Sequence, residues 1–227
     1  MAGRMEMKSM GKVDTVVFDL DGTLLNTLDD LADSTNYALE QYGFPSRTIE
    51  EVRRFVGNGV GKLMERAVPG GADNPRFGEV LDCFKRHYVD HCMVKIGLYP
   101  GIADLLARLK AAGYKVAIVS NKLQGGVDEL YAHYFRDTVQ AAVGEREGVR
   151  RKPAPDMVEM ALSELGASKD TAVYVGDSDV DVATAAAAGL PCISVLWGFR
   201  DRDFLLRHGA VCLAETPADV FRILQEG

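Results

Sequence analysis

The segment from Val16 to Thr23 reads Val-Val-Phe-Asp-Leu-Asp-Gly-Thr. Its three apolar residues predict a buried strand, and Gly22 allows the backbone to turn sharply directly after it. Asp19 and Asp21 lie where the strand gives way to the turn. In open α/β sheets, ligands bind beyond the carboxyl ends of the strands, so these carboxylates are expected to reach a crevice. An isolated Asp-x-Asp pair is equally typical of capping groups, and later segments decide between the two interpretations.

Length and composition indicate an ordinary globular protein. The chain has 227 residues, 47% of them hydrophobic and 26% charged, which suits one large domain or a domain with a smaller one inserted. The net charge of -7 argues against a general nucleic-acid binder, which is expected to present a basic face. We therefore expect no nucleic-acid partner.

The cysteines and the apolar runs predict a soluble cytoplasmic protein that is not exported. Cys83, Cys92, Cys192 and Cys212 form no CxxC pair and no metal-ligand spacing, so they are expected to be reduced. Residues 1–12 are polar and basic, without the apolar centre of a signal peptide. No later stretch approaches membrane-spanning length, and no membrane partner is expected.

Two patterns of hydrophobic residues divide the chain into two parts. Residues 26–94 carry helical periodicity and predict a small helical domain, whereas residues 1–25 and 95–227 predict the main domain. The helices expected in the smaller domain cover residues 28–42, 49–56, 60–67 and 77–88.

In the main domain, apolar β-rich runs alternate with helical segments after residue 99. The runs expected as strands cover residues 115–119, 138–143, 171–175 and 192–196. This alternation predicts βαβ units, so the fold class is α/β with a Rossmann-like, mostly parallel sheet flanked by helices. Right-handed crossovers bring the residues that follow each strand to one edge of that sheet.

Polar groups follow the other strands as well as the first. Ser120 and Asn121 end the second run, Lys152 follows the third, and Asp177 and Asp181 follow the fourth. Each group has an ordinary structural explanation, such as a helix cap, a solvated basic run or an acidic helix N-terminus. Separate explanations at every strand end, in this order, are less economical than one shared site.

That shared site is suited to phosphoryl transfer, in which catalysis is largely positioning and electrostatic stabilisation. Asp19 can attack phosphorus, and Lys152 can hold the charge that develops on the phosphoryl group. The carboxylates can hold a hard divalent cation, and Mg²⁺ suits an all-oxygen site.

In these motifs the chain resembles the haloacid dehalogenase-like superfamily, and within it the phosphoglycolate phosphatase group. The motifs are DLDGT at 19–23, SN at 120–121, KPAP at 152–155 and GDSDVD at 176–181. The resemblance covers nearly the whole chain and implies that the helical segment is a cap domain inserted between the first two motifs.

The resemblance also implies roles for the residues. Asp19 would form an aspartyl-phosphate, and Asp21 would protonate the leaving alcohol and then activate water. Ser120 and Lys152 would hold the phosphoryl oxygens. The residues expected at the substrate are Thr23, Asn121, Gly57, Asn58 and Gly59.

Magnesium is the cofactor that the resemblance implies. Its ligands would be Asp19, the backbone carbonyl of Asp21 and Asp177, with Asp181 in a supporting position. The expected partner is a small anionic phosphorylated metabolite, and the chain is expected to be a monomer or a homodimer.

Asp21 favours ester chemistry, because a general acid at this position serves a leaving oxygen that needs a proton. The leading hypothesis is a magnesium-dependent phosphatase of 2-phosphoglycolate. The alternatives are a pyrophosphatase, a sugar phosphomutase on the same scaffold, and a non-catalytic regulator that binds a phosphorylated ligand. The shared core does the chemistry, so the physiological substrate is decided elsewhere.

Overall fold

The computed structural model describes residues 13–226. They form two compact units, one made of the residues up to Leu24 and from Leu98 onward, the other of Leu25–Gly97. We call them the core unit and the helical unit. Over the described residues, none of the helices combines the length and the apolar character needed to cross a bilayer.

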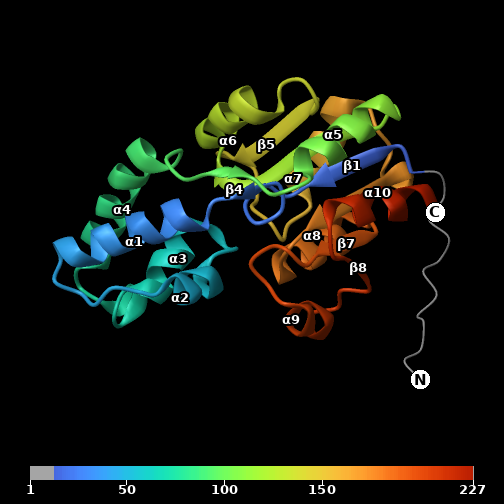
Figure 1. The fold of residues 1–227 in the computed structure, drawn as a ribbon. Helices are drawn as coiled ribbons and strands as arrows, with labels where there is room; N and C mark the ends of the chain where they lie inside the picture. The colour runs from blue at the N-terminus through green and yellow to red at the C-terminus, as the bar shows by residue number, and fades with distance from the viewer. Residues whose placement is uncertain (1–12, 227) are drawn as a thin grey trace. The chain divides into compact units, whose positions relative to one another are not determined.

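The core unit is built on a six-stranded sheet (Figure 1). Its strands are β1 (Thr15–Phe18), β4 (Lys115–Leu123), β5 (Ala141–Glu145), β6 (Ala172–Gly176), β7 (Cys192–Val195) and β8 (Cys212–Ala214). Every neighbouring pair is parallel, in the order β5-β4-β1-β6-β7-β8. The predicted α/β fold class is confirmed. After β1 the main sheet continues with β4 and β5 on one side of β1, and the chain then crosses to β6, β7 and β8 on the other side. The topological switch point, where such sheets bind ligands, therefore lies at the end of β1.

Helices cover both faces of this sheet. They are α5 (Ile102–Ala111), α6 (Gln124–Leu130), α7 (Asp156–Leu165), α8 (Asp179–Ala188) and α10 (Pro217–Glu226), whereas the short helix α9 (Arg202–Arg207) lies in the connection between β7 and β8. On one face, Val17 and Tyr174 share a core with Met157 of α7 and Ala185 of α8. The strand residues that alternate with them, such as Phe18, are also fully buried, as expected for a parallel sheet covered on both sides.

Local sequence explains where several elements end. The alanine-rich end of α8 has high helix propensity, and Gly189 stops the helix with a left-handed φ of 75°. A single π-helical turn, Tyr131–Phe135, continues α6. Two 3₁₀ turns, Gly71–Asp73 and Lys169–Thr171, complete the helical segments.

The helical unit contains α1 (Leu28–Gln41), α2 (Ile49–Phe55), α3 (Gly59–Ala67) and α4 (Phe77–His91). The large side chains of its buried centre include Leu39, Val52, Leu63, Met64 and Phe84. The α2 helix begins with a capping box between Thr48 and Glu51. A two-stranded ladder, β2 (Leu25–Asn26) with β3 (Gly97–Leu98), joins the segments that enter and leave this unit.

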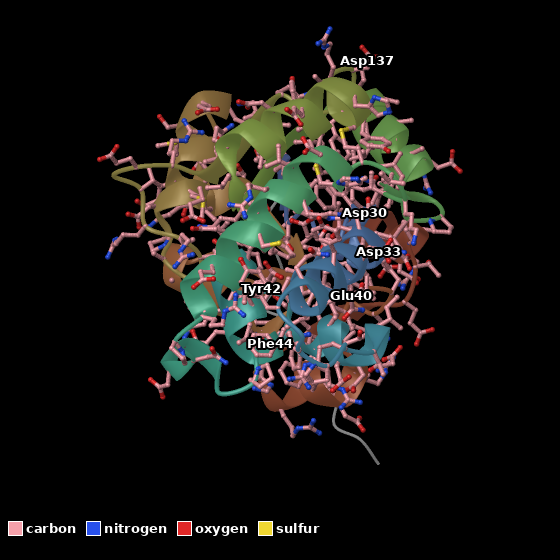
Figure 2. All side chains as sticks on the ribbon, turned by 90° about the vertical axis from the view of Figure 1, so that its left-hand side faces the viewer. Asp30, Asp33, Glu40, Tyr42, Phe44 and Asp137 are labelled. Atoms are coloured by element: carbon pink, nitrogen blue, oxygen red, sulfur yellow. The ribbon has the colours of Figure 1, made fainter. Side chains whose placement is uncertain are left out.

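Acidic residues of α1 fasten the segment that follows α4. Asp30 and Asp33 both lie on α1 (Figure 2). The buried carboxylate of Asp30 accepts hydrogen bonds from the Lys95 N–H at 3.0 and 3.1 Å. The Lys95 ammonium lies 2.6 Å from Asp33. These acidic side chains therefore serve the structure of the helical unit.

Candidate active site

The first motif ends β1 in a tight turn. The Asp19 N–H donates to the carbonyl of Val175 in β6 at 2.9 Å, and the Asp19 side chain is buried. Gly22 has a φ of 91°, and a Cβ there would lie 2.5 Å from Oδ2 of Asp177. The turn therefore needs glycine both for its backbone angle and for the close approach of the fourth motif.

Lys152 is the buried cation of the site. Its Nζ donates to Asp19 Oδ1 at 2.6 Å, to Asp181 Oδ1 at 2.9 Å and to the Tyr174 hydroxyl at 3.1 Å. Its side chain is only 3% exposed, so it is not part of a solvated basic run. Asn121 fixes the Lys152 backbone: the Asn121 amide donates to its carbonyl at 3.2 Å and accepts from its N–H at 2.9 Å.

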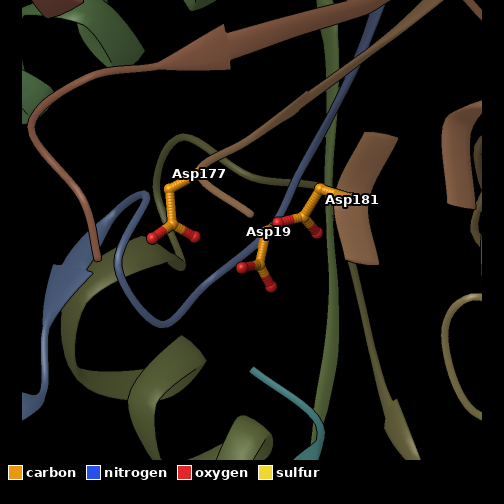
Figure 3. Close-up of side chains that lie close together, drawn as sticks. All are labelled: Asp19, Asp177 and Asp181. Atoms are coloured by element: carbon orange, nitrogen blue, oxygen red, sulfur yellow. The ribbon is translucent and has the colours of Figure 1, made fainter. Parts of the chain in front are cut away.

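Three carboxylates lie close together in the core unit (Figure 3), and two of them contact Lys152. Ligand oxygens of Asp19, Asp177 and Asp181 all lie within 4.8 Å of one another, and all three residues are buried. Asp181 caps α8, because its Oδ2 accepts from the N–H and the hydroxyl of Ser178 at 3.0 and 2.6 Å. Asp177 Oδ2 accepts from the Phe199 N–H at 2.6 Å.

The charges of this cluster do not balance. With three carboxylates against the one ammonium of Lys152, the fully ionised cluster has an excess of two negative charges in a buried place, which the charge of Arg200 near Asp177 offsets only in part. Burial, and then the charge of Asp181, raise the pKa of Asp19 well above its usual value. The same two causes raise the pKa of Asp177 to about 7. An all-oxygen cluster with this excess charge is suited to a divalent cation.

Lys152 remains charged in this environment. Burial opposes its charge, but the carboxylates of Asp181 and Asp19 outweigh burial and raise the pKa of the ammonium well above its usual value. Tyr174 stays neutral, because burial raises the pKa of its hydroxyl well above the ordinary value. The tyrosine therefore acts as a neutral hydrogen-bonding group between Lys152 and Asp181.

Asp21 lies in a half-buried position beside the second motif. Its Oδ2 accepts a long hydrogen bond of 3.4 Å from the Ser120 hydroxyl. Its Oδ1 lies 3.3 Å from the ammonium of Lys122. Thr23, by contrast, is fully buried, and its carbonyl accepts from the Trp197 indole N–H at 2.9 Å.

Gly57, Asn58 and Gly59 belong to the helical unit. Gly57 and Gly59 have positive φ angles of 122° and 79°, so both glycines serve the turn between α2 and α3. The Asn58 side chain accepts from Arg66 at 2.9 Å, and Arg66 also donates to the Phe55 carbonyl at 2.6 Å. The loop is therefore braced from within its own unit.

Two side chains of the site escaped the sequence-based prediction. Tyr174 lies inside an apolar strand and gives no sign of its hydroxyl contacts. Lys122 directly follows Ser120 and Asn121, and that adjacency is the signal that could have pointed to it.

Comparison with known proteins agrees with this architecture. A family model described as haloacid dehalogenase-like hydrolase matches residues 16–195. The chain is 32% identical to phosphoglycolate phosphatase 1 of Pseudomonas aeruginosa, over 93% of this chain and 77% of that protein. It is 36% identical to a phosphoglycolate phosphatase of Mesorhizobium japonicum, over 82% of this chain and 84% of the relative.

Solved structures show the same fold. A candidate phosphoglycolate phosphatase from Lactobacillus delbrueckii subsp. bulgaricus superposes with a TM-score of 0.90 at 36% identity, covering 94% of this chain and 98% of that one. CbbY from Rhodobacter sphaeroides, solved in complex with phosphate, gives a TM-score of 0.72 at 27% identity, covering 92% and 96%. Family model, relatives and structures agree, and the chain belongs to the haloacid dehalogenase-like hydrolases, in the phosphoglycolate phosphatase group.

Proposed function

We propose that this hydrolase is a magnesium-dependent phosphoric monoester hydrolase that cleaves 2-phosphoglycolate through an aspartyl-phosphate. The observation that carries the proposal is the contact of 2.6 Å between the buried Lys152 ammonium and Asp19, inside a cluster of buried carboxylates. Relatives that carry the name phosphoglycolate phosphatase support the choice of substrate.

In this mechanism Asp19 is the nucleophile. One of its oxygens forms a bond to phosphorus while the ester P–O bond breaks, and its Oδ1 keeps the contact with Lys152. Lys152 and Ser120 hold the charge that spreads over the phosphoryl oxygens. Asp21 gives its proton to the leaving alkoxide and then takes a proton from the water that hydrolyses the aspartyl-phosphate.

The residues that would hold Mg²⁺ are Asp19, the backbone carbonyl of Asp21, and Asp177. Bound there, Mg²⁺ supplies positive charge that balances the carboxylates and the phosphoryl group. Asp181 has a supporting position, because its oxygens already accept from Lys152, Tyr174 and Ser178. In this proposal Gly57, Asn58 and Gly59 of the helical unit contact the remainder of the substrate.

Mg²⁺ is expected to stabilise the protein more at about pH 8 than at about pH 5.5. The pKa of Asp177 is about 7 in the folded state, above the ordinary value of 3.8. The folded metal-free protein therefore holds a proton that the unfolded chain releases, and its stability falls as pH rises from about 4 through 7. Mg²⁺ binds the ionised carboxylates and reverses this loss.

Thermal unfolding at both pH values, with Mg²⁺ and with EDTA, measures this effect. The metal-dependent rise in Tm should be larger at the higher pH and absent in Asp177→Asn. EDTA should also stop phosphate release. The metal assignment would be refuted by a Tm that does not change with Mg²⁺ at either pH value, or by full turnover in metal-free buffer.

Phosphate release across a substrate panel tests the proposed activity. The panel contains 2-phosphoglycolate, pyrophosphate, nucleoside monophosphates and sugar phosphates. We expect a clear preference for 2-phosphoglycolate in kcat/KM. A preference for pyrophosphate, isomerisation of a sugar phosphate, or no turnover of any member would instead favour the pyrophosphatase, the mutase or the regulator respectively.

A further inference from the structure

The core unit places a second lysine at the site, in contact with the proposed general acid. Lys122 Nζ lies 3.3 Å from Asp21 Oδ1, and the two side chains are only 12% and 18% exposed. We infer that Lys122 is a positioning residue, which holds the Asp21 carboxyl group where it can protonate the leaving oxygen. This inference rests on the proposed function.

The backbone around Lys122 is built to fix its side chain. Pairing between β4 and β5 shifts register between Val119 and Leu123, and Lys122 lies in that irregular stretch. Its N–H donates to the Ser120 hydroxyl at 3.1 Å. Ser120 therefore contacts both the backbone of Lys122 and the carboxylate of Asp21.

Glycines leave room for this lysine. A Cβ at Gly126, in the first turn of α6, would lie 3.2 Å from Lys122 Cδ and 3.4 Å from Cγ. A Cβ at Gly144 would lie 2.8 Å from the Lys122 carbonyl oxygen. The lysine stem thus lies directly on the glycine surface of α6, and its position is set by packing as well as by charge.

The carboxylate of Asp21 is held from two sides, by Ser120 at Oδ2 and by Lys122 at Oδ1. Oδ2 accepts from Ser120, whereas Oδ1 is buried and accepts no hydrogen bond within the described residues. The ammonium of Lys122 lies close enough to attract Oδ1, but it is not aligned as a hydrogen-bond donor. Together the hydrogen bond from Ser120 and the ion pair with Lys122 fix the orientation of the carboxyl group through both of its oxygens.

The consequence depends on the leaving group. When Asp19 attacks, the P–O electron pair passes to the leaving oxygen, and the protonated form of Asp21 gives that oxygen its proton; Asp21 regains a proton from the water that later hydrolyses the aspartyl-phosphate. An alkoxide needs the proton because it is strongly basic, whereas a nitrophenolate leaves without it. Misplacing Asp21 should therefore slow the cleavage of alkyl esters more than the cleavage of nitrophenyl esters. The ratio kcat/KM reports the steps up to the release of the alcohol, so later hydrolysis of the aspartyl-phosphate does not mask the effect.

The test compares Lys122→Met with the unsubstituted protein on three substrates: 2-phosphoglycolate, ethyl phosphate and nitrophenyl phosphate. We expect kcat/KM to fall by roughly 10²-fold on both alkyl esters and by less than about threefold on the nitrophenyl ester. Lys122→Arg, which keeps the charge, should recover part of the loss.

Other patterns overturn the inference. Equal losses on all three esters would make Lys122 a structural residue, and a loss confined to 2-phosphoglycolate would make it a binding group for the substrate carboxylate. In either case the proposed function would stand, provided that Asp19→Asn is inactive. An active Asp19→Asn variant would instead contradict the proposed function itself, because that function uses Asp19 as the nucleophile.

A matched pair of glycine variants tests the packing. Gly125 and Gly126 are neighbours in α6, but a Cβ at Gly125 meets nothing within 4 Å. Gly126→Ala should lower the alkyl-to-nitrophenyl ratio of kcat/KM by about threefold, in the same direction as Lys122→Met. Gly125→Ala should leave the ratio unchanged. Equal ratios in the two alanine variants would contradict the placement of Lys122 on which the inference depends.

Discussion

Asp19→Asn is expected to lower turnover of 2-phosphoglycolate by roughly 10⁴-fold or more, with no loss of thermal stability. The amide cannot attack phosphorus, yet it keeps the shape of the carboxylate and can still accept from Lys152 through its carbonyl oxygen. The substitution also removes a carboxylate whose charged form is disfavoured, since burial and Asp181 raise the pKa of Asp19. The fold should therefore tolerate the change.

Phosphate release and thermal unfolding of the same preparation measure both halves of this result. Asp14→Asn is the matched control, because Asp14 precedes β1 at the opposite end of the strand, is exposed, and pairs with the Thr15 hydroxyl. It should retain activity within about twofold. Normal turnover by Asp19→Asn would exclude the aspartyl-phosphate, whereas an unfolded variant would show that the site needs the Asp19 charge for stability.

Sequence predicted the parts of the fold that have strong apolar runs. The runs that form β1, β6 and β7 are buried on both faces, so their hydrophobicity is continuous and their limits lie close to the expected ones. The limits of helix α7 also follow from local sequence, because Pro155 directly precedes its first residue and Gly166 stops it in a left-handed conformation.

Pairing between strands that are distant in the sequence sets the ends of β4 and β5, which the sequence did not predict. Strand β4 continues to Leu123 because its partner β5 resumes pairing at Glu145 after a register shift. Strand β5 begins at Ala141 rather than near Thr138, since the N–H groups of Thr138 and Val139 bond to the Phe135 carbonyl and close the preceding helical segment. No local pattern carries this information.

Within the site, sequence identified the charged groups better than it identified their partners. The order of motifs along βαβ units predicts that Asp19, Lys152, Asp177 and Asp181 share one edge of the sheet, and the structure brings them together in one buried cluster. It did not indicate that Asn121 would bind the Lys152 backbone. That contact depends on the path of the loop after β5, which residue types alone do not fix.

Lys152→Met should cost the protein both activity and stability. The substitution removes the ammonium that contacts Asp19 and Asp181, so these two buried carboxylates lose their ion pairs. Removing one member of a buried ion pair destabilises a protein by about 3–5 kcal/mol. Turnover should fall by roughly 10³-fold, because the phosphoryl charge loses its cation as well.

The stability loss should depend on pH and on Mg²⁺. Protonation of Asp19 and Asp177 relieves the repulsion, and burial already raises the pKa of both groups. Metal-free Lys152→Met should therefore be least stable at about pH 8 and approach the unsubstituted protein at about pH 5.5. Lys152→Arg changes the shape of the side chain but keeps the charge, and it should remain folded at both pH values, which separates the effect of the charge from the effect of side-chain shape.

Denaturant unfolding of both variants with and without Mg²⁺ decides the matter. If Mg²⁺ restores much of the stability of Lys152→Met at the higher pH, then Mg²⁺ neutralises the same buried carboxylates that the Lys152 ammonium neutralises. If Lys152→Met is as stable as the unsubstituted protein at the higher pH without metal, the carboxylates do not need the lysine. The phosphoryl-transfer role of Lys152 would then have to rest on activity alone.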